Sequence, residues 1–278
     1  MIEGRVNITI LVDNYSEKGL MAEHGLSLWI EADGKHILFD TGQGQAFELN
    51  AKSLGIDIGD TDILVLSHGH FDHTGGIPYI LLPNRKIHVY GHPGLVRPRY
   101  SIRNSMPAPI HIPHESMTAI DKLSRKYIHW VQHPIALTEA IGLTGPIPRR
   151  TDFEDTGGPF YLDYMGKRPD PIDDDLALWI KTDQGVIVCT GCCHSGLVNT
   201  LDVISQLNHG LRIRAVIGGF HLVNASTDRL DQTVLALQER DIDTIIPCHC
   251  TGDHAAAYLK NSLGDRVSTG MAGKTYRF

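Results

Sequence analysis

The chain has 278 residues, of which 42% are hydrophobic and 21% charged, the balance of an ordinary globular protein. Its formal net charge of −7 disfavours a nucleic acid or an anionic membrane as the main partner. No apolar run is long enough to cross a bilayer, and residues 1–14 lack the pattern of a signal peptide. The five cysteines form two clusters, 189–193 and 248–250, which favours reduced thiols. We therefore expect a cytoplasmic protein that acts on a small molecule. Residues 2–5 (IEGR) match a protease-site tag and are equally compatible with a native sequence.

Two similar β-hairpins are predicted, one in each half of the chain. Residues 26–33 (LSLWIEAD) lead through a turn into 37–42 (ILFDTG), and residues 176–183 (LALWIKTD) lead into 186–191 (VIVCTG). Apolar, β-branched and aromatic runs joined by Asp-Gly or Asp-Gln-Gly turns are typical of hairpins. Further strand-like runs end just before three histidines, His68, His221 and His249. These repeated patterns predict two halves of similar construction.

Helical periodicity predicts helices over 45–54, 195–207, 226–238 and 252–263, with serine N-caps at Ser195 and Ser226. Strands that alternate with helices in two related halves indicate two sheets face to face with helices outside.

The middle of the chain differs from both halves, because 11 of its 14 prolines fall between His92 and Asp175. So much proline disfavours regular structure, and only 116–131 has a helical pattern there. We predict that 92–175 forms a cap over one edge of a single domain spanning 1–278. The alternative is a surface insertion with no role in the site.

Residues 67–76 (SHGHFDHTGG) place three histidines and one aspartate within six positions, directly after an apolar run typical of a buried strand. His68 and His70, two apart at a strand end, can bind one ion, whereas Asp72 and His73 suit a second. Imidazole and carboxylate are favoured by zinc, and by iron or manganese at dinuclear centres. The motif therefore predicts a site for two divalent ions, with zinc as the first choice and iron, manganese or magnesium as alternatives.

The HxHxDH motif at 68–73, together with Asp40-Thr41-Gly42, resembles the metallo-β-lactamase superfamily. Shorter motifs at 91–93 (GHP), 190–196 (TGCCHSG), 218–222 (GGFHL) and 247–252 (PCHCTG) are similar to those of one group within it. That group includes the dihydropterin–ribofuranosylaminobenzene phosphate synthases of methanopterin biosynthesis. The resemblance implies an α/β fold, an αββα four-layer sandwich of two similar halves, with one or two metal ions at one edge of the sheets.

The resemblance also implies a set of ligands. The first ion would be bound by His68, His70 and His194, and the second by Asp72, His73 and His249. Asp40 would orient one of these ligands from behind, since ligating histidines usually donate their other N–H to a carboxylate or carbonyl.

One position departs from the superfamily pattern. Cys192 stands where much of the superfamily has an aspartate that bridges the two ions. Cys192 could bridge the ions as a thiolate, or water alone could bridge them. The alternative role for Cys192 is that of a small packing residue, since free cysteine is among the most buried residue types.

Four further residues are candidates for substrate binding. His221 ends a strand at the same edge, and we expect it to contact the substrate or donate a proton, with a structural role as the alternative. His92, Arg97 and Arg99 lie at the start of the predicted cap, followed by Arg103. Because guanidinium groups pair well with phosphate and carboxylate, this group predicts an anionic substrate, with solvated surface charge as the alternative.

The predicted function is hydrolysis of an ester, lactone, thioester or phosphoester by a metal-activated water, with Asp72 holding or accepting the water's proton. The resemblance implies a second function, a transferase that displaces pyrophosphate from a pterin. A third class, a non-catalytic metabolite sensor, is opposed by the presence of all six predicted ligands. The sequence specifies neither the substrate nor the oligomeric state.

Overall fold

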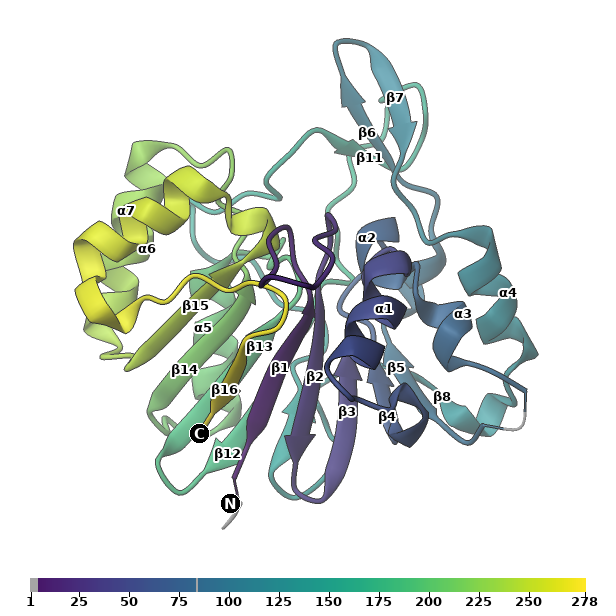
Figure 1. Cartoon of the computed structure of the whole chain (residues 1–278). Helices are drawn as coiled ribbons and strands as arrows, with labels where there is room; N and C mark the ends of the chain where they lie inside the picture. The colour runs from purple at the N-terminus through teal and green to yellow at the C-terminus, as the bar shows by residue number, and fades with distance from the viewer. Residues whose placement is uncertain (1–4, 84) are drawn as a thin grey trace.

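Two β-sheets lie face to face with helices on their outer sides (Figure 1). The computed structural model describes residues 5–83 and 85–278, so Ile2 to Gly4 of the tag-like stretch lie outside the described residues. The seven-stranded sheet has the strand order β16-β1-β2-β3-β4-β5-β8. Its strands are β1 Asn7–Val12, β2 Ser27–Ala32, β3 Lys35–Phe39, β4 Ile63–Val65, β5 His88–Gly91, β8 Ile128–Trp130 and β16 Thr275–Arg277.

The six-stranded sheet has the strand order β15-β14-β13-β12-β10-β9. Its strands are β9 Ile135–Ala136, β10 Ile141–Leu143, β12 Ala177–Thr182, β13 Gly185–Thr190, β14 Ile213–Gly219 and β15 Thr244–Cys248. Each sheet contains an antiparallel hairpin, β2–β3 or β12–β13, whose second strand pairs in parallel with β4 or β14. A further parallel strand, β5 or β15, follows in each sheet. The two halves therefore share one construction, as the repeated hairpin motif predicts.

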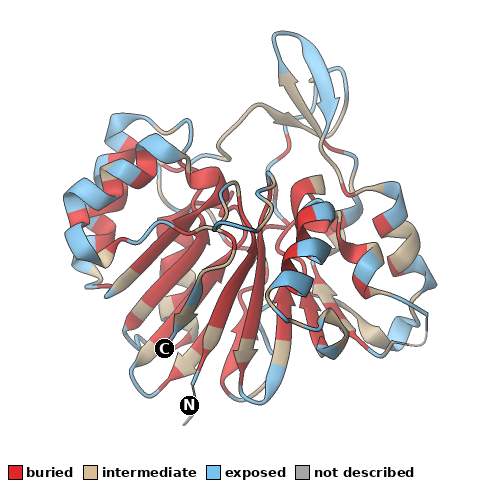
Figure 2. Cartoon of the chain, viewed as in Figure 1, coloured by how far each residue is buried: buried red, intermediate tan, exposed pale blue. Residues whose placement is uncertain are grey.

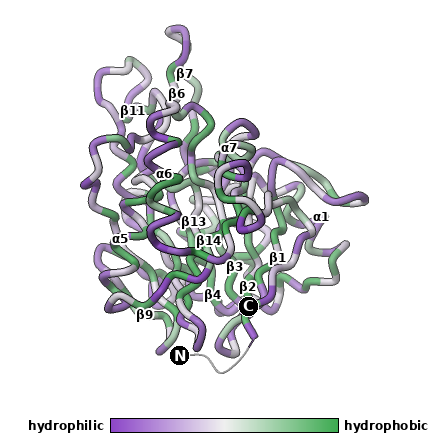
Figure 3. The backbone as a smooth tube through the Cα atoms, turned by 90° about the vertical axis from the view of Figure 1, so that its left-hand side faces the viewer, coloured by the Kyte–Doolittle hydropathy of each residue, from purple (hydrophilic) through white to green (hydrophobic). Residues whose placement is uncertain are grey.

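Apolar side chains from both sheets fill the space between them, among them Ile30, Phe39, Leu178 and Ile217, all fully buried. Figure 2 shows the strands buried over most of their length, and Figure 3 shows hydrophobic stretches along the strands. The outer faces are covered by α1 Gln45–Ser53, α3 Ile77–Ile80 and α4 His114–Lys122 on one side, and by α5 Leu197–Leu207, α6 Thr227–Glu239 and α7 Asp253–Leu263 on the other. The short α2 Phe71–Thr74 lies at the sheet edge.

The helices differ from the sequence prediction mainly at their starts and in the middle of the chain. Ser226 caps α6 by accepting a hydrogen bond from the Arg229 N–H, whereas the N-cap of α5 is Gly196 instead of the predicted Ser195. The predicted helix over 116–131 ends at Lys122, because the backbone is extended at Leu123. Residues 128–130 instead form strand β8, which pairs with β5. Among the described residues, no helix is long and apolar enough to cross a membrane.

The predicted cap over 92–175 is divided between the sandwich and a separate small sheet. Strands β8, β9 and β10 of this segment belong to the two main sheets, and α4 covers one of them. Only the three-stranded sheet of β6 Tyr100–Arg103, β7 Met106–Pro109 and β11 Phe160–Tyr161 stands away from the sandwich (Figure 1). The prolines explain the division, because all but one of those in the segment fall in 93–113 or 146–171, and only Pro134 lies between.

Candidate metal centre

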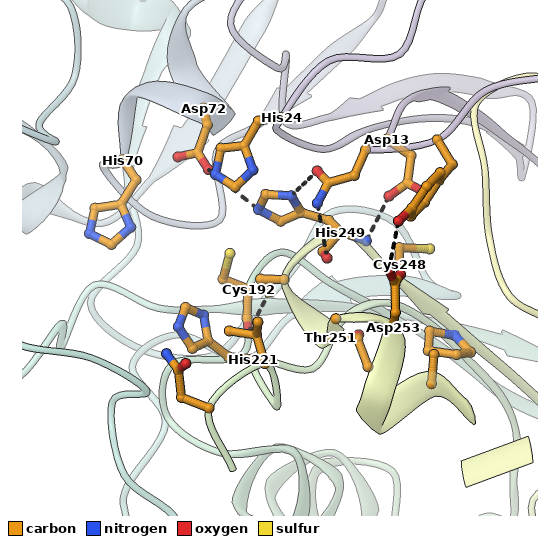
Figure 4. Close-up of a pocket in the computed structure, with 18 of the residues that line it drawn as sticks. Asp13, His24, His70, Asp72, Cys192, His221, Cys248, His249, Thr251 and Asp253 are labelled. Atoms are coloured by element: carbon orange, nitrogen blue, oxygen red, sulfur yellow. Dashed lines mark hydrogen bonds and ion pairs between the residues drawn. The ribbon is translucent and has the colours of Figure 1, made fainter. Parts of the chain in front are cut away.

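The predicted ligands meet at one edge of the sandwich, where strands of both sheets end. His68 and His70 follow β4, and Asp72 and His73 lie in α2. His194 and His249 follow β13 and β15 of the other sheet. A cavity of about 410 Å³ opens at this edge, and its lining includes His70, Asp72, Cys192, His221 and His249 (Figure 4).

The first group of ligand atoms comes from His68, His194 and Cys192, and the predicted ligand His70 contacts His68 without belonging to the group. The Nε2 of His68 lies 2.9 Å from the Nδ1 of His70. One ligand atom each from His68, His194 and Cys192 lies within 4.8 Å of the others. The Nε2 of His194 is buried and has no hydrogen-bond partner among the described residues. A buried nitrogen without a partner is destabilising, and a divalent ion would satisfy it, so these residues fit a metal ion.

The second group comes from Asp72, His73 and His249, again with Cys192. The Nε2 of His73 lies 3.1 Å from the sulfur of Cys192, and His249 offers a nitrogen within 4.8 Å of both. The Asp72 Oδ2 lies 3.3 Å from the Nε2 of His249. The sulfur of Cys192 therefore belongs to both groups and lies where two ions could share it.

Asp40 orients one histidine of each group, His73 directly and His68 through Ser67. Its fully buried carboxylate accepts hydrogen bonds from the backbone N–H and hydroxyl of Ser67, at 2.7 and 2.6 Å, and its Oδ2 lies 2.7 Å from the Nδ1 of His73. The Ser67 hydroxyl in turn lies 2.9 Å from the Nδ1 of His68. These contacts place a proton on the Nδ1 of both His73 and His68, so that Nε2 is the nitrogen that each ring turns toward the cluster.

The other two histidines are oriented in the same way. The Nδ1 of His194 lies 2.8 Å from the backbone carbonyl oxygen of Thr156, and the Nδ1 of His249 lies 2.9 Å from the Oδ1 of Asn14. Both contacts leave Nε2 as the atom that faces the cluster. Four histidine rings thus turn Nε2 inward, the atom with which each would bind a metal ion.

The charges of the site in its metal-free form follow from burial and close neighbours. Burial lowers the pKa of His68 and His194 well below the usual value, so both rings are neutral near pH 7. Burial also lowers the pKa of His73, but Asp40 and Asp72 outweigh it and raise the pKa to about 9. Burial opposes ionisation of Asp72, yet its histidine neighbours hold the pKa of that carboxyl well below its usual range. His73 therefore carries a proton that a metal ion must displace.

The backbone turns sharply at this edge of the sandwich. Four non-glycine residues at strand ends have positive φ angles: Asp40 (59°), Cys193 (60°), His221 (45°) and His249 (47°). This left-handed conformation is unfavourable for such residues and is found most often at functional sites. At each of these positions the turn directs a side chain or its neighbour toward the cluster.

The prediction that Arg99 binds the substrate is corrected by the structure. Its guanidinium group is fully buried and forms ion pairs with Asp170 and Asp174, so it does not reach the cavity. Asp174 also accepts a hydrogen bond from the Gly69 N–H, between the two ligands of the motif, at 2.9 Å. Arg99 therefore connects the small sheet to the loop that carries His68 and His70.

His92 and Arg97 do not line the cavity either. The Nδ1 of His92 accepts a hydrogen bond from the Gly94 N–H, and Arg97 pairs with Asp173 at the surface. Arg103 of β6 lines the cavity instead, together with His221. The sequence could not show which of these arginines lines the cavity, because the aspartates that pair with Arg97 and Arg99 lie more than 70 residues away in the chain.

His221 lies against the first group of ligands. Its ring centroid is 4.2 Å from that of His194, and its Nδ1 is buried without a partner among the described residues. Gly157 packs against the other face of the ring so closely that a Cβ there would overlap it. His221, Cys192 and Cys250 each offer a ligand atom within 4.8 Å of the others.

Sequence reasoning missed two residues of the site, both in the loop between β1 and β2. The Nε2 of His24 lies 3.1 Å from the Oδ2 of Asp72, and Asn14 holds His249 as described above. No spacing relates either residue to the HxHxDH motif. The only local signal is Gly25, where a Cβ would overlap the Asp72 carbonyl oxygen, so that the loop can approach α2 only with glycine at this position.

Comparison with known proteins agrees with this geometry. Residues 21–203 match the family described as the metallo-beta-lactamase superfamily. The chain belongs to this superfamily. It is 30% identical to the 7,8-dihydropterin-6-methyl-4-(β-D-ribofuranosyl)-aminobenzene-5′-phosphate synthase of Methanocaldococcus jannaschii, over 98% of this chain and 97% of that protein. A second protein of that organism, with no assigned function, is 34% identical over 91% of this chain and 93% of its own length.

Solved structures show the same relationship. The crystal structure of a metal-dependent hydrolase of the β-lactamase superfamily has a TM-score of 0.81 and 30% identity, with 98% of both chains covered. A diphosphatase of the PhnP family, at 14% identity and a TM-score of 0.55 over 99% of this chain and 98% of its own, shares the fold. The predicted superfamily and its fold are therefore confirmed.

Proposed function

We propose that this chain is a metal-dependent hydrolase that cleaves an ester, lactone, thioester or phosphoester bond in a small anionic molecule. One observation carries the proposal: four histidine rings, each with its outer nitrogen hydrogen-bonded, point their Nε2 atoms at a cluster beside a cavity. Two divalent ions bound there would lower the pKa of a water molecule and stabilise negative charge developing on the substrate.

Asp72 is suited to handle the proton of the attacking water. It lines the cavity, and its neighbours keep its carboxylate ionised. In the proposed reaction, Asp72 holds or accepts the water's proton while its Oδ2 remains at the second group of ligands. His221 faces the cavity from the opposite sheet and contacts the substrate or donates a proton to the leaving group.

We propose further that Cys192 bridges two ions as a thiolate. Its sulfur belongs to both groups of ligand atoms, and it is only 2% exposed. Burial raises the pKa of the free thiol well above its usual value, so the thiolate forms only when a metal ion replaces the proton. Imidazole, carboxylate and thiolate together favour zinc, with iron or manganese as alternatives, whereas magnesium prefers oxygen ligands.

An anionic substrate fits the lining of the cavity. Arg103 is the one lysine or arginine among the described residues that line it, and it lies on β6 of the small sheet above the ligands. Ser101 of the same strand and Asn224 add hydrogen-bonding groups. A guanidinium group in the lining of the cavity suits a phosphate or carboxylate on the part of the substrate that does not react.

The similarity to the pterin synthase, over 98% of this chain, favours a second candidate, a transferase that displaces pyrophosphate. The same ligands could bind the cations that a diphosphate leaving group needs. Purified, metal-loaded protein should be assayed with a panel of esters, lactones, thioesters and phosphoesters, and separately with a pterin diphosphate together with an aminobenzene acceptor, which forms the new bond to the pterin as pyrophosphate leaves. Hydrolysis of a panel member that is lost in His249→Ala supports the hydrolase. Pyrophosphate release without hydrolysis of any panel member would favour the transferase instead.

A further inference from the structure

The loop that carries His24 is fixed against the metal ligands. The Nε2 group of Gln43 donates a hydrogen bond to the His24 carbonyl oxygen at 2.7 Å, and the Gly25 N–H donates to the Oδ1 of Asn14 at 3.3 Å. The same Asn14 oxygen contacts the ring of His249. The Leu26 N–H also donates a hydrogen bond to the Asp72 carbonyl oxygen at 3.3 Å, which ties the backbone beside residue 24 to Asp72. His24 is therefore held at the cluster before any ligand binds.

The distances around Asp72 match those between ligands of one metal ion. The Asp72 Oδ2 lies 3.1 Å from the Nε2 of His24 and 3.3 Å from the Nε2 of His249, and all three atoms lie within 4.8 Å of one another. Two ligands bound at about 2.0–2.1 Å to one tetrahedral ion are about 3.3–3.4 Å apart. Figure 4 shows the rings of His24 and His249 on the same side of the Asp72 carboxylate.

We propose that His24 is a ligand of the second ion, alongside Asp72 and His249. The inference rests on the metal-dependent function proposed above, and it adds a residue outside the HxHxDH pattern to the centre.

His24 differs from the other histidines of the centre in how its ring is held. In the other four histidines the Nδ1 atom, which faces away from the cluster, makes a hydrogen bond inside the protein; these are His68, His73, His194 and His249. The side chain of His24 is 60% exposed, and its Nδ1 has no hydrogen-bond partner among the described residues. Rotation of its ring toward solvent therefore breaks only the contact between its Nε2 and the Asp72 carboxylate. Catalytic metal sites keep one coordination position at which water or substrate can bind. The structure assigns this position to His24, as the ligand that water or substrate can replace.

The test compares the metal affinity of the wild type, His24→Ala and His24→Gln, with His254→Ala as the control. His254 is an exposed histidine of α7 that belongs to none of the metal-ligand groups among the described residues. Metal-free protein is titrated with Zn²⁺ against a competing chelator, and with Co²⁺ while the visible spectrum is recorded. Neither readout depends on knowing the substrate.

Both His24 variants should bind the first ion as tightly as the wild type and the second about 100-fold more weakly, with an altered Co²⁺ spectrum for the second ion only. Loss of even an outer partner of a ligand weakens binding about 10–100-fold. His254→Ala should match the wild type. Wild-type affinity for the second ion in His24→Gln, which can still donate a hydrogen bond to Asp72, would overturn the inference and leave His24 a hydrogen-bond donor. A wild type that binds no second ion would instead overturn the dinuclear function.

Discussion

Substitution of Asp40 by asparagine should disrupt both groups of ligands although Asp40 itself faces away from the cavity. Its carboxylate receives three hydrogen bonds, from the Ser67 N–H, the Ser67 hydroxyl and His73 Nδ1. An asparagine side chain has one acceptor oxygen and one NH₂ group, so either orientation places a donor against a donor. With the NH₂ group facing His73, the ring must move its proton to Nε2, the atom that faces Cys192.

The size of the effect follows from these contacts. Loss of an outer partner of a metal ligand weakens affinity about 10–100-fold, which is about 1.4–2.8 kcal/mol. Asp40 contacts His73 directly and His68 through Ser67, so each ion should lose affinity in this range. By contrast, Asn14→Ala removes only the partner of His249 and should weaken the second ion alone.

The assay is competitive titration of metal-free protein with Zn²⁺, with the exposed turn substitution Asp183→Asn as the matched control. Asp40→Asn should bind both ions more weakly, and Asp183→Asn should bind them as the wild type does. If Asp40→Asn binds two ions with wild-type affinities, the reasoning about ring tautomers is refuted.

Four further predictions follow from the same contacts. His249→Ala should lose the second ion and the activity together, as measured by elemental analysis and turnover. Cys192→Ser should abolish the near-ultraviolet sulfur-to-metal absorption of the Co²⁺ form, because serine offers no thiolate. Because His73 is protonated below a pKa of about 9, binding of its ion should release a proton below that pH, and affinity should fall about tenfold per pH unit below it, as calorimetry in several buffers will show. Arg99→Met should destabilise the fold by about 3–5 kcal/mol in urea unfolding, because it leaves two buried aspartates unpaired.

Each of these predictions has a contrary result. Full activity of His249→Ala would remove it from the ligands, and an unchanged Co²⁺ spectrum in Cys192→Ser would return that residue to a packing role. Metal affinity that is constant between pH 6 and 9 would contradict the protonated His73. Wild-type stability of Arg99→Met would mean that its ion pairs do not hold the small sheet to the ligand loop.

The sequence was sufficient for the fold and for the meeting of the motif residues at one edge of the sandwich, because their signals are local; that these residues bind metal stays a prediction. The two hairpins repeat one pattern of apolar residues and turns, and HxHxDH places four ligand side chains within one loop and one helical turn. Asp40 lies at the end of the first hairpin, where the superfamily resemblance puts a supporting carboxylate. These features depend on residues that are close in the chain.

The rest depends on contacts between distant segments, which no spacing reveals. Arg99 is buried by two aspartates 71 and 75 residues away, so its availability to a substrate could not be judged from the sequence. His24 reaches Asp72 only because Gly25 allows close contact between the loop and α2. The helix expected over 116–131 ends early because pairing with β5 stabilises residues 128–130 as a strand.

The most direct test of the account is elemental analysis of protein purified without added metal or chelator. The account predicts two ions of zinc, iron or manganese per chain, bound by the ligands that meet around Cys192. One ion per chain, or none with activity only on added magnesium, would contradict the dinuclear centre and favour the pyrophosphate-displacing transferase.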